Sequence, residues 1–307
     1  MATIANNIIN TCTLNVNGLL DNYCQYSLKC FCLQNNIDIL FLQETHVSNL
    51  KKVNELNDYF DMYKCFWNFG SNFSRGTAIF ISHSLDFKIN KFHRDLEGRF
   101  QYIDVDIDCI PYRLLNIYAP TNECERKEFF EVVYPFILTK DCKIFGGDFN
   151  CIINSKLDKK GGNLDRGFVG TNQLKDIIYD FELFDVFRYI EPNLNSYTWH
   201  SKNIACRLDR IYLSNCLKSF VRNCKHIPFA FFDHDGVFVS FINNINVKKG
   251  QGYWKLNSSV LKDKCFVDSF REWFTNFSDS LDICNDIWDY FKENIITFCI
   301  DYCKRKK

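Results

Sequence analysis

Side chains that could do acid–base or metal chemistry stand where short apolar runs begin or end in this 307-residue chain. Such runs predict buried β-strands, and strand ends are rigid places on which functional sites are built. Glu44 follows the apolar run 37–42, and Asp148 follows two glycines after the run 143–145. The residues that share such positions are Asn15, Asn17, Glu44, Tyr118, Thr121, Asn122, Asp148, Asn150, Asp209, Asp233 and His234.

These side chains offer the groups that hydrolysis of a phosphate ester requires. Oxygen ligands without paired thiols suit Mg²⁺ rather than zinc, and Glu44 is the natural first ligand. Such a cation would neutralise charge on the phosphoryl and leaving oxygens. Asp148 could position or deprotonate water, and Asp209 could fix His234 as a proton donor or acceptor. Asn15, Asn150 and Tyr118 would donate hydrogen bonds that hold the phosphate in line.

Each of these elements also has a simpler structural explanation. The segment Gly147–Asn150 alone is more typical of a turn, and Glu44 alone is about as often a helix cap or an ion-pair partner. An Asp-His dipeptide such as 233–234 is usually a surface pair, and Tyr118 alone is typical of a core residue. These explanations do not account for six such elements in one order along the chain. The order therefore carries the functional interpretation.

The ordered motifs resemble those of the endonuclease/exonuclease/phosphatase superfamily over about residues 8–243. The segments that carry the resemblance are Leu14–Gly18, Gln43–His46, Asn116–Pro120, Gly147–Asn150, Leu208–Arg210 and Asp233 with His234. Within the superfamily, Gln-Glu-Thr-His together with Asn-Ile-Tyr-Ala-Pro is most similar to the endonuclease domain of non-LTR (LINE-type) retrotransposons. The segment Gly252–Asn257, Gly-Tyr-Trp-Lys-Leu-Asn, supports this because a similar segment follows that domain in such elements.

The resemblance implies a four-layer α/β sandwich in which two packed mixed sheets are flanked by helices. It implies a DNA endonuclease that depends on Mg²⁺, with Mn²⁺ able to substitute, and that leaves a 3′-hydroxyl and a 5′-phosphate. In a retrotransposon that 3′-hydroxyl would prime reverse transcription at the target. The metal ligands that the resemblance implies are Asn15, Glu44, Asp148, Asn150, Asp233 and His234. The catalytic residues that it implies are Tyr118, Asp148, Asn150, Asp209 and His234. The substrate contacts that it implies are Asn17, Tyr118, Thr121 and Asn122.

The chain departs from the pattern of the superfamily at three positions. Asn17 stands where AP endonucleases carry Asp, which puts a second metal position in doubt. Thr121 replaces the Asn that commonly follows Tyr-x-Pro, with Asn122 as a candidate substitute, and Phe232 replaces the usual Ser before Asp-His. None of these changes removes a central role. The chain also contains no Tyr-x-Asp-Asp segment, so we expect no reverse transcriptase domain in it, and we expect a domain fragment or a decayed, truncated reading frame.

The elements that must position these residues alternate between β-rich runs and amphipathic stretches up to about residue 245. The expected strands are 8–16, 37–42, 77–82, 100–107, 113–118, 143–145, 196–200, 207–213 and 237–242, and the expected helices are 23–35, 126–138 and 171–184. Apolar residues recur every three or four positions over 261–303. We therefore expect a catalytic domain over 1–245, and over 246–307 a linker and helical extension that would lead to a missing reverse transcriptase.

Composition sets the outer limits of the interpretation. A 47% hydrophobic share is enough for a sizeable core, and 37 basic against 37 acidic residues exclude a polybasic, histone-like role. Sixteen cysteines without a Cys-x-x-Cys pair, and no secretory signal, predict reduced, mostly buried thiols in an intracellular protein, nuclear if it acts on genomic DNA. No apolar run approaches the roughly 18 residues that span a bilayer.

Three hypotheses about function follow from these patterns. The first is a Mg²⁺-dependent DNA endonuclease of retrotransposon origin, with DNA as partner, no membrane and a monomeric catalytic domain. The second keeps the chemistry but changes the substrate, as in an AP endonuclease or exonuclease III-like repair nuclease or another phosphoesterase of the superfamily; the loops 70–76, 158–170 and 192–203 would decide it. The third is a decayed copy that folds without turnover, against which the intact Glu44, Asp148, Asp209 and His234 argue. The helical extension is interpreted as a linker, with a dimerisation pair as the alternative.

Overall fold

The computed structural model describes residues 8–162, 168–229, 232–243 and 258–279, and residues 291, 294–295, 297–299 and 301–303. The chain divides into two compact units, Met1–Ile245 and Asn246–Lys307. All of the candidate site residues belong to the first unit, and each unit is described by itself. The segment 252–257, which contributed to the resemblance, lies outside the described residues.

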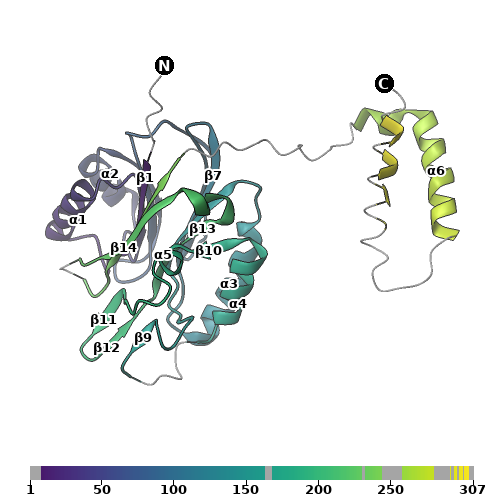
Figure 1. The fold of residues 1–307 in the computed structure, drawn as a ribbon. Coiled ribbons are helices and arrows are strands. Elements are labelled where there is room, and N and C mark those ends of the chain that lie inside the picture. Colours follow the sequence, from purple (N-terminus) through teal and green to yellow (C-terminus); the bar gives the residue numbers. More distant parts are fainter. Residues whose placement is uncertain are drawn as a thin grey trace, which may run out of the picture. The chain divides into compact units, whose positions relative to one another are not determined.

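Two six-stranded mixed sheets form the centre of the first unit (Figure 1). The first sheet has the spatial order β14 (Val221–Ile227), β15 (Gly236–Ile242), β1 (Ile8–Asn15), β2 (Ile39–Gln43), β4 (Thr77–Ser82) and β3 (Tyr63–Asn68). The second has the order β10 (Leu183–Asp185), β13 (Asp209–Ser214), β8 (Cys142–Asp148), β7 (Ile110–Tyr118), β6 (Phe100–Ile107) and β5 (Phe87–Arg94). The pairs β1–β2 and β7–β8 are parallel, and the other pairs are antiparallel.

Helices cover the outer face of each sheet, so the unit has four layers (Figure 1). Helices α1 (Asn22–Gln34) and α2 (Leu50–Tyr59) pack on the first sheet through Leu28, Val53 and Leu56. Helices α3 (Glu123–Ile137) and α4 (Thr171–Asp180) pack on the second sheet through residues such as Phe130 and Leu174. A third apolar cluster lies between the two sheets. This arrangement confirms the expected four-layer α/β sandwich.

The interior between the sheets changes from apolar to polar along the strands. Residues that face the other sheet recur every second position, and along β1 they run from Ile9 to Thr11, Thr13 and Asn15. Along β2 they run from two apolar residues to Gln43. We call the buried residues Thr11, Thr13, Gln43, Thr77, Gln101 and Asn116 the polar layer. The candidate site residues lie immediately beyond this layer, at the same end of the strands.

One hydrogen-bonded bridge in the polar layer joins the two sheets. The Gln43 side-chain amide donates to Asn116 Oδ1 at 2.7 Å, and it also donates to Thr13 Oγ1 at 2.9 Å. The Asn116 amide in turn donates to the backbone oxygens of Leu42 and Ala78 at 2.9 and 2.8 Å. Because Gln43 precedes Glu44 and Asn116 precedes Tyr118 by two residues, this bridge fixes the strand ends that carry the site.

Every predicted strand and helix of the first unit is present, most of them with shifted ends, and the predicted strands 77–82 and 100–107 match β4 and β6 in full. The expected helix 171–184 stops at Asp180, because the chain turns at Phe181 and Glu182 into the short strand β10. The structure adds α2, β3, β5 and β14, a short helix α5 (Val186–Ile190), and a 3₁₀ turn η1 (Asn215–Phe220). The predicted strand 196–200 is present as β11 (Trp199–Ser201), which forms a small sheet with two strands that the sequence did not predict, β12 (Ile204–Cys206) and β9 (Lys159–Lys160).

The second unit is helical over its described residues, as the apolar spacing predicts. A 3₁₀ turn η2 (Ser258–Lys262) precedes helix α6 (Lys264–Asp279). The ring of Trp273 stacks on Phe298 with centroids 5.0 Å apart, and Phe266 meets the edge of Tyr302 at 5.0 Å. The Tyr302 hydroxyl donates to Asp263 at 3.0 Å. These aromatic contacts bury one side of α6 against the described residues beyond 290.

All fifteen described cysteines carry free thiols, as expected of a reduced chain. The expectation that most of them are buried is wrong, because only six lie in the interior. The others are exposed or half-buried, such as Cys109 in the turn between β6 and β7, Cys124 in α3 and Cys216 in η1. Among the described residues, no helix has the length and apolar character needed to cross a membrane.

Candidate functional site

The candidate site lies where the polar layer opens to solvent. Strands β1, β2, β7 and β8 all end there, and β13 starts there because it runs antiparallel to β8, with Asp209 opposite Asp148. The parallel register of β7 and β8 likewise sets Tyr118 beside Asp148. The sheets therefore bring together side chains that stand more than a hundred residues apart in the sequence.

Two carboxylates converge on a single amide at the centre of the site. The buried Asn15 Nδ2 donates to Glu44 Oε1 at 2.8 Å and to Asp148 Oδ2 at 3.1 Å. Asn15 is itself oriented, because its Oδ1 accepts the backbone N–H of Asn17 at 3.0 Å. The two carboxylates offer the oxygen ligands that a hard divalent cation prefers, and the Asn15 amide nitrogen holds them close together as a hydrogen-bond donor, so the residues fit such an ion.

Glu44 is held in its ionised form by its neighbours. Burial raises the pKa of this carboxyl, but hydrogen bonds from His46, Asn15 and Tyr118 outweigh burial and lower it below its usual value. His46 Nε2 lies 3.6 Å from Glu44 Oε2. For Tyr118, burial and the nearby charges of Glu44 and Asp148 raise the pKa of the phenol. Tyr118 therefore stays a neutral donor beside a charged carboxylate.

Asp148 has the opposite electrostatic setting. Its burial, together with the negative charge of Asp209, raises its pKa to about 7, although His234, Asn150 and Asn15 act in the other direction. The Asn150 backbone N–H donates to Asp148 Oδ1 at 2.9 Å, and the Asn150 amide donates to the Ala119 carbonyl at 2.8 Å. Asp148 is thus a firmly oriented carboxyl group whose pKa is near neutral pH, as a general base requires.

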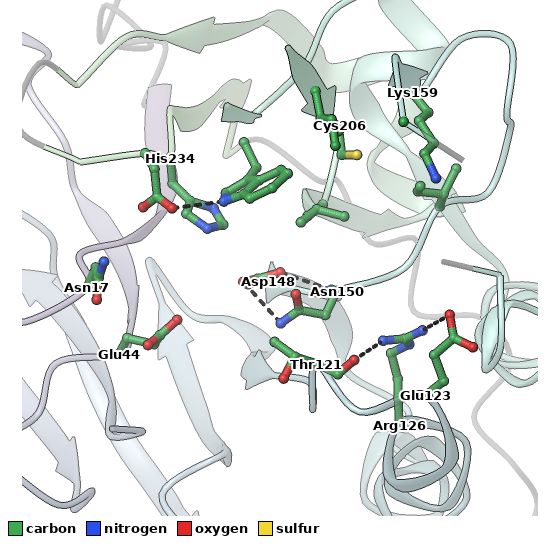
Figure 2. A pocket seen from close by; sticks show the side chains of 16 residues that line it. Asn17, Glu44, Thr121, Glu123, Arg126, Asp148, Asn150, Lys159, Cys206 and His234 are labelled. Carbon is green, nitrogen blue, oxygen red and sulfur yellow. Dashed lines mark hydrogen bonds and ion pairs between the residues drawn. The ribbon is translucent and has the colours of Figure 1, made fainter. Parts of the chain in front are cut away.

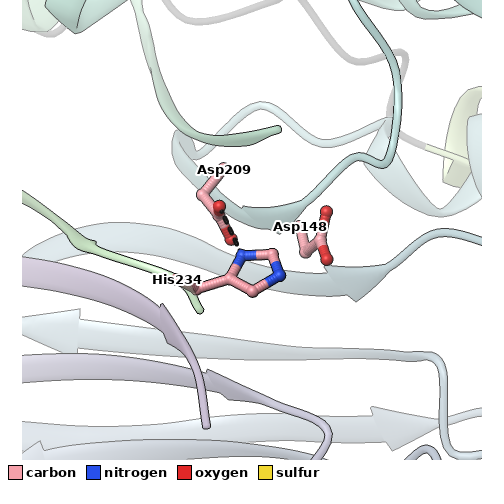
Figure 3. Close-up of side chains that lie close together, drawn as sticks. All are labelled: Asp148, Asp209 and His234. Atoms are coloured by element: carbon pink, nitrogen blue, oxygen red, sulfur yellow. Dashed lines mark hydrogen bonds and ion pairs between the residues drawn. The ribbon is translucent and has the colours of Figure 1, made fainter. Parts of the chain in front are cut away.

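Asp209 and His234 form a buried charged pair (Figure 3). His234 Nδ1 lies 2.8 Å from Asp209 Oδ2, and both side chains are almost fully buried. Burial opposes protonation of the imidazole, but the charge and hydrogen bond of Asp209 outweigh it and raise the pKa of His234 to about 10. The imidazole lies between Asp209 and Asp148, and one atom of each of the three side chains falls within 4.8 Å of the others.

Thr198 and two buried arginines fix the start of β13, which carries Asp209. Thr198 Oγ1 accepts the backbone N–H groups of Leu208 and Asp209, both at 3.0 Å. The guanidinium of Arg207 bonds Asp158 at 2.8 Å and Asp185 at 2.8 Å, and Arg210 donates to the Cys151 carbonyl. The charges of Arg210 and Arg207 outweigh burial and lower the pKa of Asp158. The backbone of Asp209 is therefore fixed by Thr198, and the buried arginines at 207 and 210 anchor the chain on either side of it.

The backbone is strained at several of these positions. Asn17, Glu44, His46 and Asn150 all have positive φ, between 37° and 58°, although none is glycine. Residues other than glycine adopt this backbone conformation rarely, and holding a residue in it costs about 1–3 kcal/mol. Four such residues lie around one group of carboxylates, and six more lie at other positions of the described chain, so this strain accompanies the site without being confined to it.

A cavity of about 590 Å³ opens beside these groups (Figure 2). The side chains of Glu44, Asp148 and His234 face it. Its wall on the far side is formed partly by the small sheet, through Trp199 and Lys159. The complete lining is Asn17, Glu44, Thr121, Glu123, Arg126, Asp148, Asn150, Ile152, Lys159, Gly162, Trp199, Ile204, Cys206, Leu208, Asp233 and His234.

The structure brings most of the predicted site residues to this cavity. Asn17, Glu44, Thr121, Asp148, Asn150, Asp233 and His234 line it, and Asn15, Tyr118 and Asp209 support the lining residues from behind. Asn122 is placed differently. Its side-chain oxygen accepts the N–H groups of Cys124 and Glu125 and caps α3, so this oxygen already has partners.

Sequence reasoning missed Trp199 and Thr198 at the site. Trp199 lines the cavity, and its indole N–H donates to Asp233 Oδ2 at 2.8 Å. Thr198 is buried behind Asp209. Their signal is weak in a single sequence, since a threonine and a tryptophan in a β-run are equally typical of an ordinary strand.

The fold, the ordered motifs and the geometry of this site define the class of protein. The chain belongs to the Endonuclease/Exonuclease/phosphatase family, which it matches over residues 12–231. The resemblance stated from the motifs is thereby confirmed, and members of this family are nucleases and phosphoesterases.

The chain is similar in sequence to a transposon protein and in fold to solved nuclease and phosphatase structures. Over 306 residues the chain is 28% identical to the Transposon TX1 uncharacterized 149 kDa protein of Xenopus laevis. The aligned region covers 95% of this chain but 23% of that protein. The chain thus spans less than a quarter of that relative. Two solved structures share the fold: the AP endonuclease LMAP of Leishmania major (TM-score 0.64, 18% identity, 77% of this chain and 88% of that one) and the 3′ phosphatase NExo of Neisseria bound to a product DNA hairpin (TM-score 0.64, 18% identity, 76% and 99%).

Proposed function

We propose that this chain is a divalent-metal-dependent phosphodiesterase that nicks DNA to leave a 3′-hydroxyl and a 5′-phosphate, as the endonuclease of a non-LTR retrotransposon. The observation that carries the chemistry is the convergence of three side chains on one cavity. These are an ionised Glu44, an Asp148 whose pKa is about 7, and a protonated His234. The similarity to a transposon protein supports the biological role. The fold shared with a phosphatase bound to a DNA hairpin supports DNA as the substrate.

The proposed metal site uses the carboxylates of Glu44 and Asp148 as its nearest ligands, with Asn15, Asn150 and Asp233 at its margin. A bound Mg²⁺ or Mn²⁺ supplies positive charge for the phosphoryl oxygens and the leaving oxygen. His234 is less suited to coordination, because its raised pKa keeps both ring nitrogens protonated. We assign it the role of a hydrogen-bond donor instead.

The roles of the chain's own groups follow from their settings. Asp148 would accept a proton from the attacking water, and Asn150 would hold that carboxylate in place. His234 would donate from Nε2 to a phosphoryl oxygen, while Asp209 keeps Nδ1 engaged and the ring charged. Tyr118 would donate its phenol proton toward the phosphate from the Glu44 side.

Positively charged side chains line the cavity although the formal net charge of the whole chain is zero. Lys159 and Arg126 both line it, and Asn17 and Thr121 add neutral donors at its rim. The 37 acidic residues that cancel the basic ones include the carboxylates of the site itself. A nuclease needs local contacts to a few phosphates, so neutrality of the whole chain is compatible with DNA binding.

The test is nicking of supercoiled plasmid by the full chain in Mg²⁺. Replacement of Asp148 or His234 by alanine should lower the rate by about 10²- to 10⁴-fold, the range typical of a general acid–base group. Asp176→Asn, a change to an exposed aspartate on α4, is the matched control and should retain the wild-type rate. A wild-type chain that nicks no DNA, or variants that nick as fast as it does, would contradict the proposal and favour a decayed copy.

The products and the metal give two further readouts. Nicks with 3′-hydroxyl and 5′-phosphate ends are sealed by DNA ligase without prior treatment, and any other ends are not. Calorimetric titration with Mn²⁺ should show binding that Glu44→Gln weakens, and chelation should abolish nicking. A parallel assay on a duplex with one abasic site separates the two substrates: a strong preference for that duplex would replace the retrotransposon role with an AP endonuclease.

A further inference from the structure

Two thiols lie in contact at the end of the second sheet remote from the cavity. Cys142 is the first residue of β8, whose last residue is Asp148, and Cys216 lies in η1 directly after β13. Their Sγ atoms are 3.3 Å apart. Within the described ranges, no other two cysteines are recorded at hydrogen-bonding distance. The proposed nuclease chemistry uses neither residue.

The local fold holds the two thiols together. Strands β8 and β13 are antiparallel neighbours, with Leu213 opposite Ile144, so the chain reaches Cys216 just beyond the paired region. The Lys143 backbone N–H donates to Ser214 Oγ at 2.8 Å, which ties the start of β8 to the end of β13. The thiol contact is therefore a consequence of strand register rather than of two mobile side chains meeting by chance.

The pair is also accessible. Cys216 is exposed and Cys142 is partly exposed, and both line a small surface cavity of about 160 Å³ with Lys143 and Ser214. A small reagent can therefore reach the two sulfur atoms from solvent. An exposed pair in contact differs from the buried cysteines of the core, which are inert for lack of access.

The electrostatic setting gives the two thiols different roles. The hydrogen bond from Cys142 lowers the pKa of Cys216 to about 7 against the opposing effect of burial, and the backbone N–H groups of η1 and the Lys143 ammonium add to the lowering. The same contact raises the pKa of Cys142. Cys216 is the nucleophile at physiological pH, and Cys142 is the protonated neighbour that can resolve it.

We propose that Cys142 and Cys216 form an oxidisable dithiol that a peroxide converts into an intramolecular disulfide. The Cys216 thiolate attacks one peroxide oxygen, so that an S–O bond forms, the O–O bond breaks, and the leaving hydroxide takes up a proton to become water. The Cys142 sulfur then attacks the sulfenic acid. An S–S bond forms, the S–O bond breaks, and the departing hydroxide takes the proton of the Cys142 thiol. Two thiols are oxidised and one peroxide is reduced to two waters.

The expected consequence is a gain in stability without a change in the site. The sulfur atoms need to approach from 3.3 Å to about 2.05 Å. The new bond would close a loop of about 75 residues, which restricts the unfolded chain. Since Cys142 and Asp148 stand at opposite ends of β8, the carboxylates keep their positions. Oxidised protein should therefore melt several degrees higher and show an unchanged nicking rate.

Peptide mapping after oxidation tests the assignment directly. The full chain is treated with one equivalent of hydrogen peroxide, alkylated and digested with trypsin, which releases Cys142 in residues 141–143 and Cys216 in residues 211–218. We expect these two peptides to be joined, and dithiothreitol to separate them and reverse the rise in melting temperature. Cys216→Ser should abolish the joined species, whereas Cys109→Ser, a change to an exposed thiol in the turn between β6 and β7, should leave it intact.

Two results would overturn the proposal. One is recovery of both peptides separately alkylated after oxidation of the folded chain. The other is Cys216 recovered as an unlinked sulfinic or mixed-disulfide form while Cys142 stays reduced. The rate of linkage should also rise with pH through about pH 7, as the Cys216 thiolate forms. These readouts do not depend on nuclease activity, so they stand apart from the proposed function.

Discussion

Replacement of Asp209 by asparagine should convert a nearly pH-independent donor into a pH-dependent one. Asp209 supplies the charge that raises the pKa of His234 to about 10 against its burial. Asparagine keeps the shape of the side chain and can still accept a hydrogen bond from Nδ1, but it removes the negative charge. Burial then acts with less opposition, so the pKa of His234 should fall to its ordinary value of about 6.5 or below.

The magnitude follows from the two protonation curves. In the wild type, a pKa of about 10 keeps His234 almost fully protonated at pH 8. In Asp209→Asn, a pKa of at most about 6.5 leaves about 3% of the imidazole protonated at that pH, which predicts a loss of about 30-fold or more in nicking rate. With a pKa of about 6.5, the ratio of variant to wild-type rate should rise about ninefold as the pH falls from 8.5 to 7.5, and about fivefold more from 7.5 to 6.5.

The assay is single-turnover nicking in saturating Mg²⁺ from pH 6 to 8.5. The ratio of rates cancels any titration that both proteins share. Loss of the Asp209 charge also removes one cause that raises the pKa of Asp148, so NMR titration of the imidazole is the readout that isolates His234. Asp235→Asn is the matched control, because Asp235 lies 3.0 Å from His200 in a second, more exposed histidine–aspartate pair. That variant should show a ratio near one at every pH. Titration of the imidazole signals by NMR reports the pKa of His234 directly, without reference to activity.

The refuting result is a ratio that stays constant with pH. A loss of rate that is the same at pH 6.5 and pH 8.5 would mean that Asp209 acts through position alone. An imidazole signal of His234 that titrates at the same pH in variant and wild type would show that the charge of Asp209 does not set its protonation.

Two further predictions concern the scaffold. Gly147→Ala should destabilise the fold by at least about 2 kcal/mol in urea unfolding, because Gly147 has φ +148° and a Cβ there would lie 2.1 Å from the Ile117 carbonyl oxygen; an unchanged midpoint would contradict this reading of the β7–β8 contact. Asn116→Ala should cost about 3 kcal/mol in the same measurement, since it leaves the buried Gln43 amide and two backbone oxygens with fewer partners, and a cost under 1 kcal/mol would mean that the bridge between the sheets contributes little.

The order of polar residues at strand ends predicts a group of side chains that the structure brings together at one end of the sandwich. Apolar runs predict buried strands, so a carboxylate within a few residues of the end of such a run is carried to the sheet edge, as with Glu44 and Asp148. The distances among them, and the shared amide of Asn15, depend on how the two sheets pack. That packing is set by many weak contacts far apart in the sequence, which no local pattern records.

Two of the elements missed from the sequence, α2 and β5, bury few apolar residues. Helix α2 buries only Val53 and Leu56 among polar residues, and β5 alternates exposed and half-buried positions at the edge of its sheet. Elements with few buried apolar residues give a sequence pattern little to register. The side chain of Asn122 illustrates the same limit at the site, since a predicted substrate contact and a helix cap require the same residue type.

The polar layer has a consequence for how this fold can be made more heat-resistant. The usual route is to fill the interior with larger or better-packed apolar side chains, which is open near Ile39 and Ile144. In the polar layer, at the site end of the sandwich, an apolar replacement of Gln43 or Asn116 would leave the remaining buried amide without its hydrogen-bond partner. Stabilising substitutions should therefore collect in the half of the sandwich remote from the carboxylates, and the site end should be the first part of the sandwich to loosen on heating.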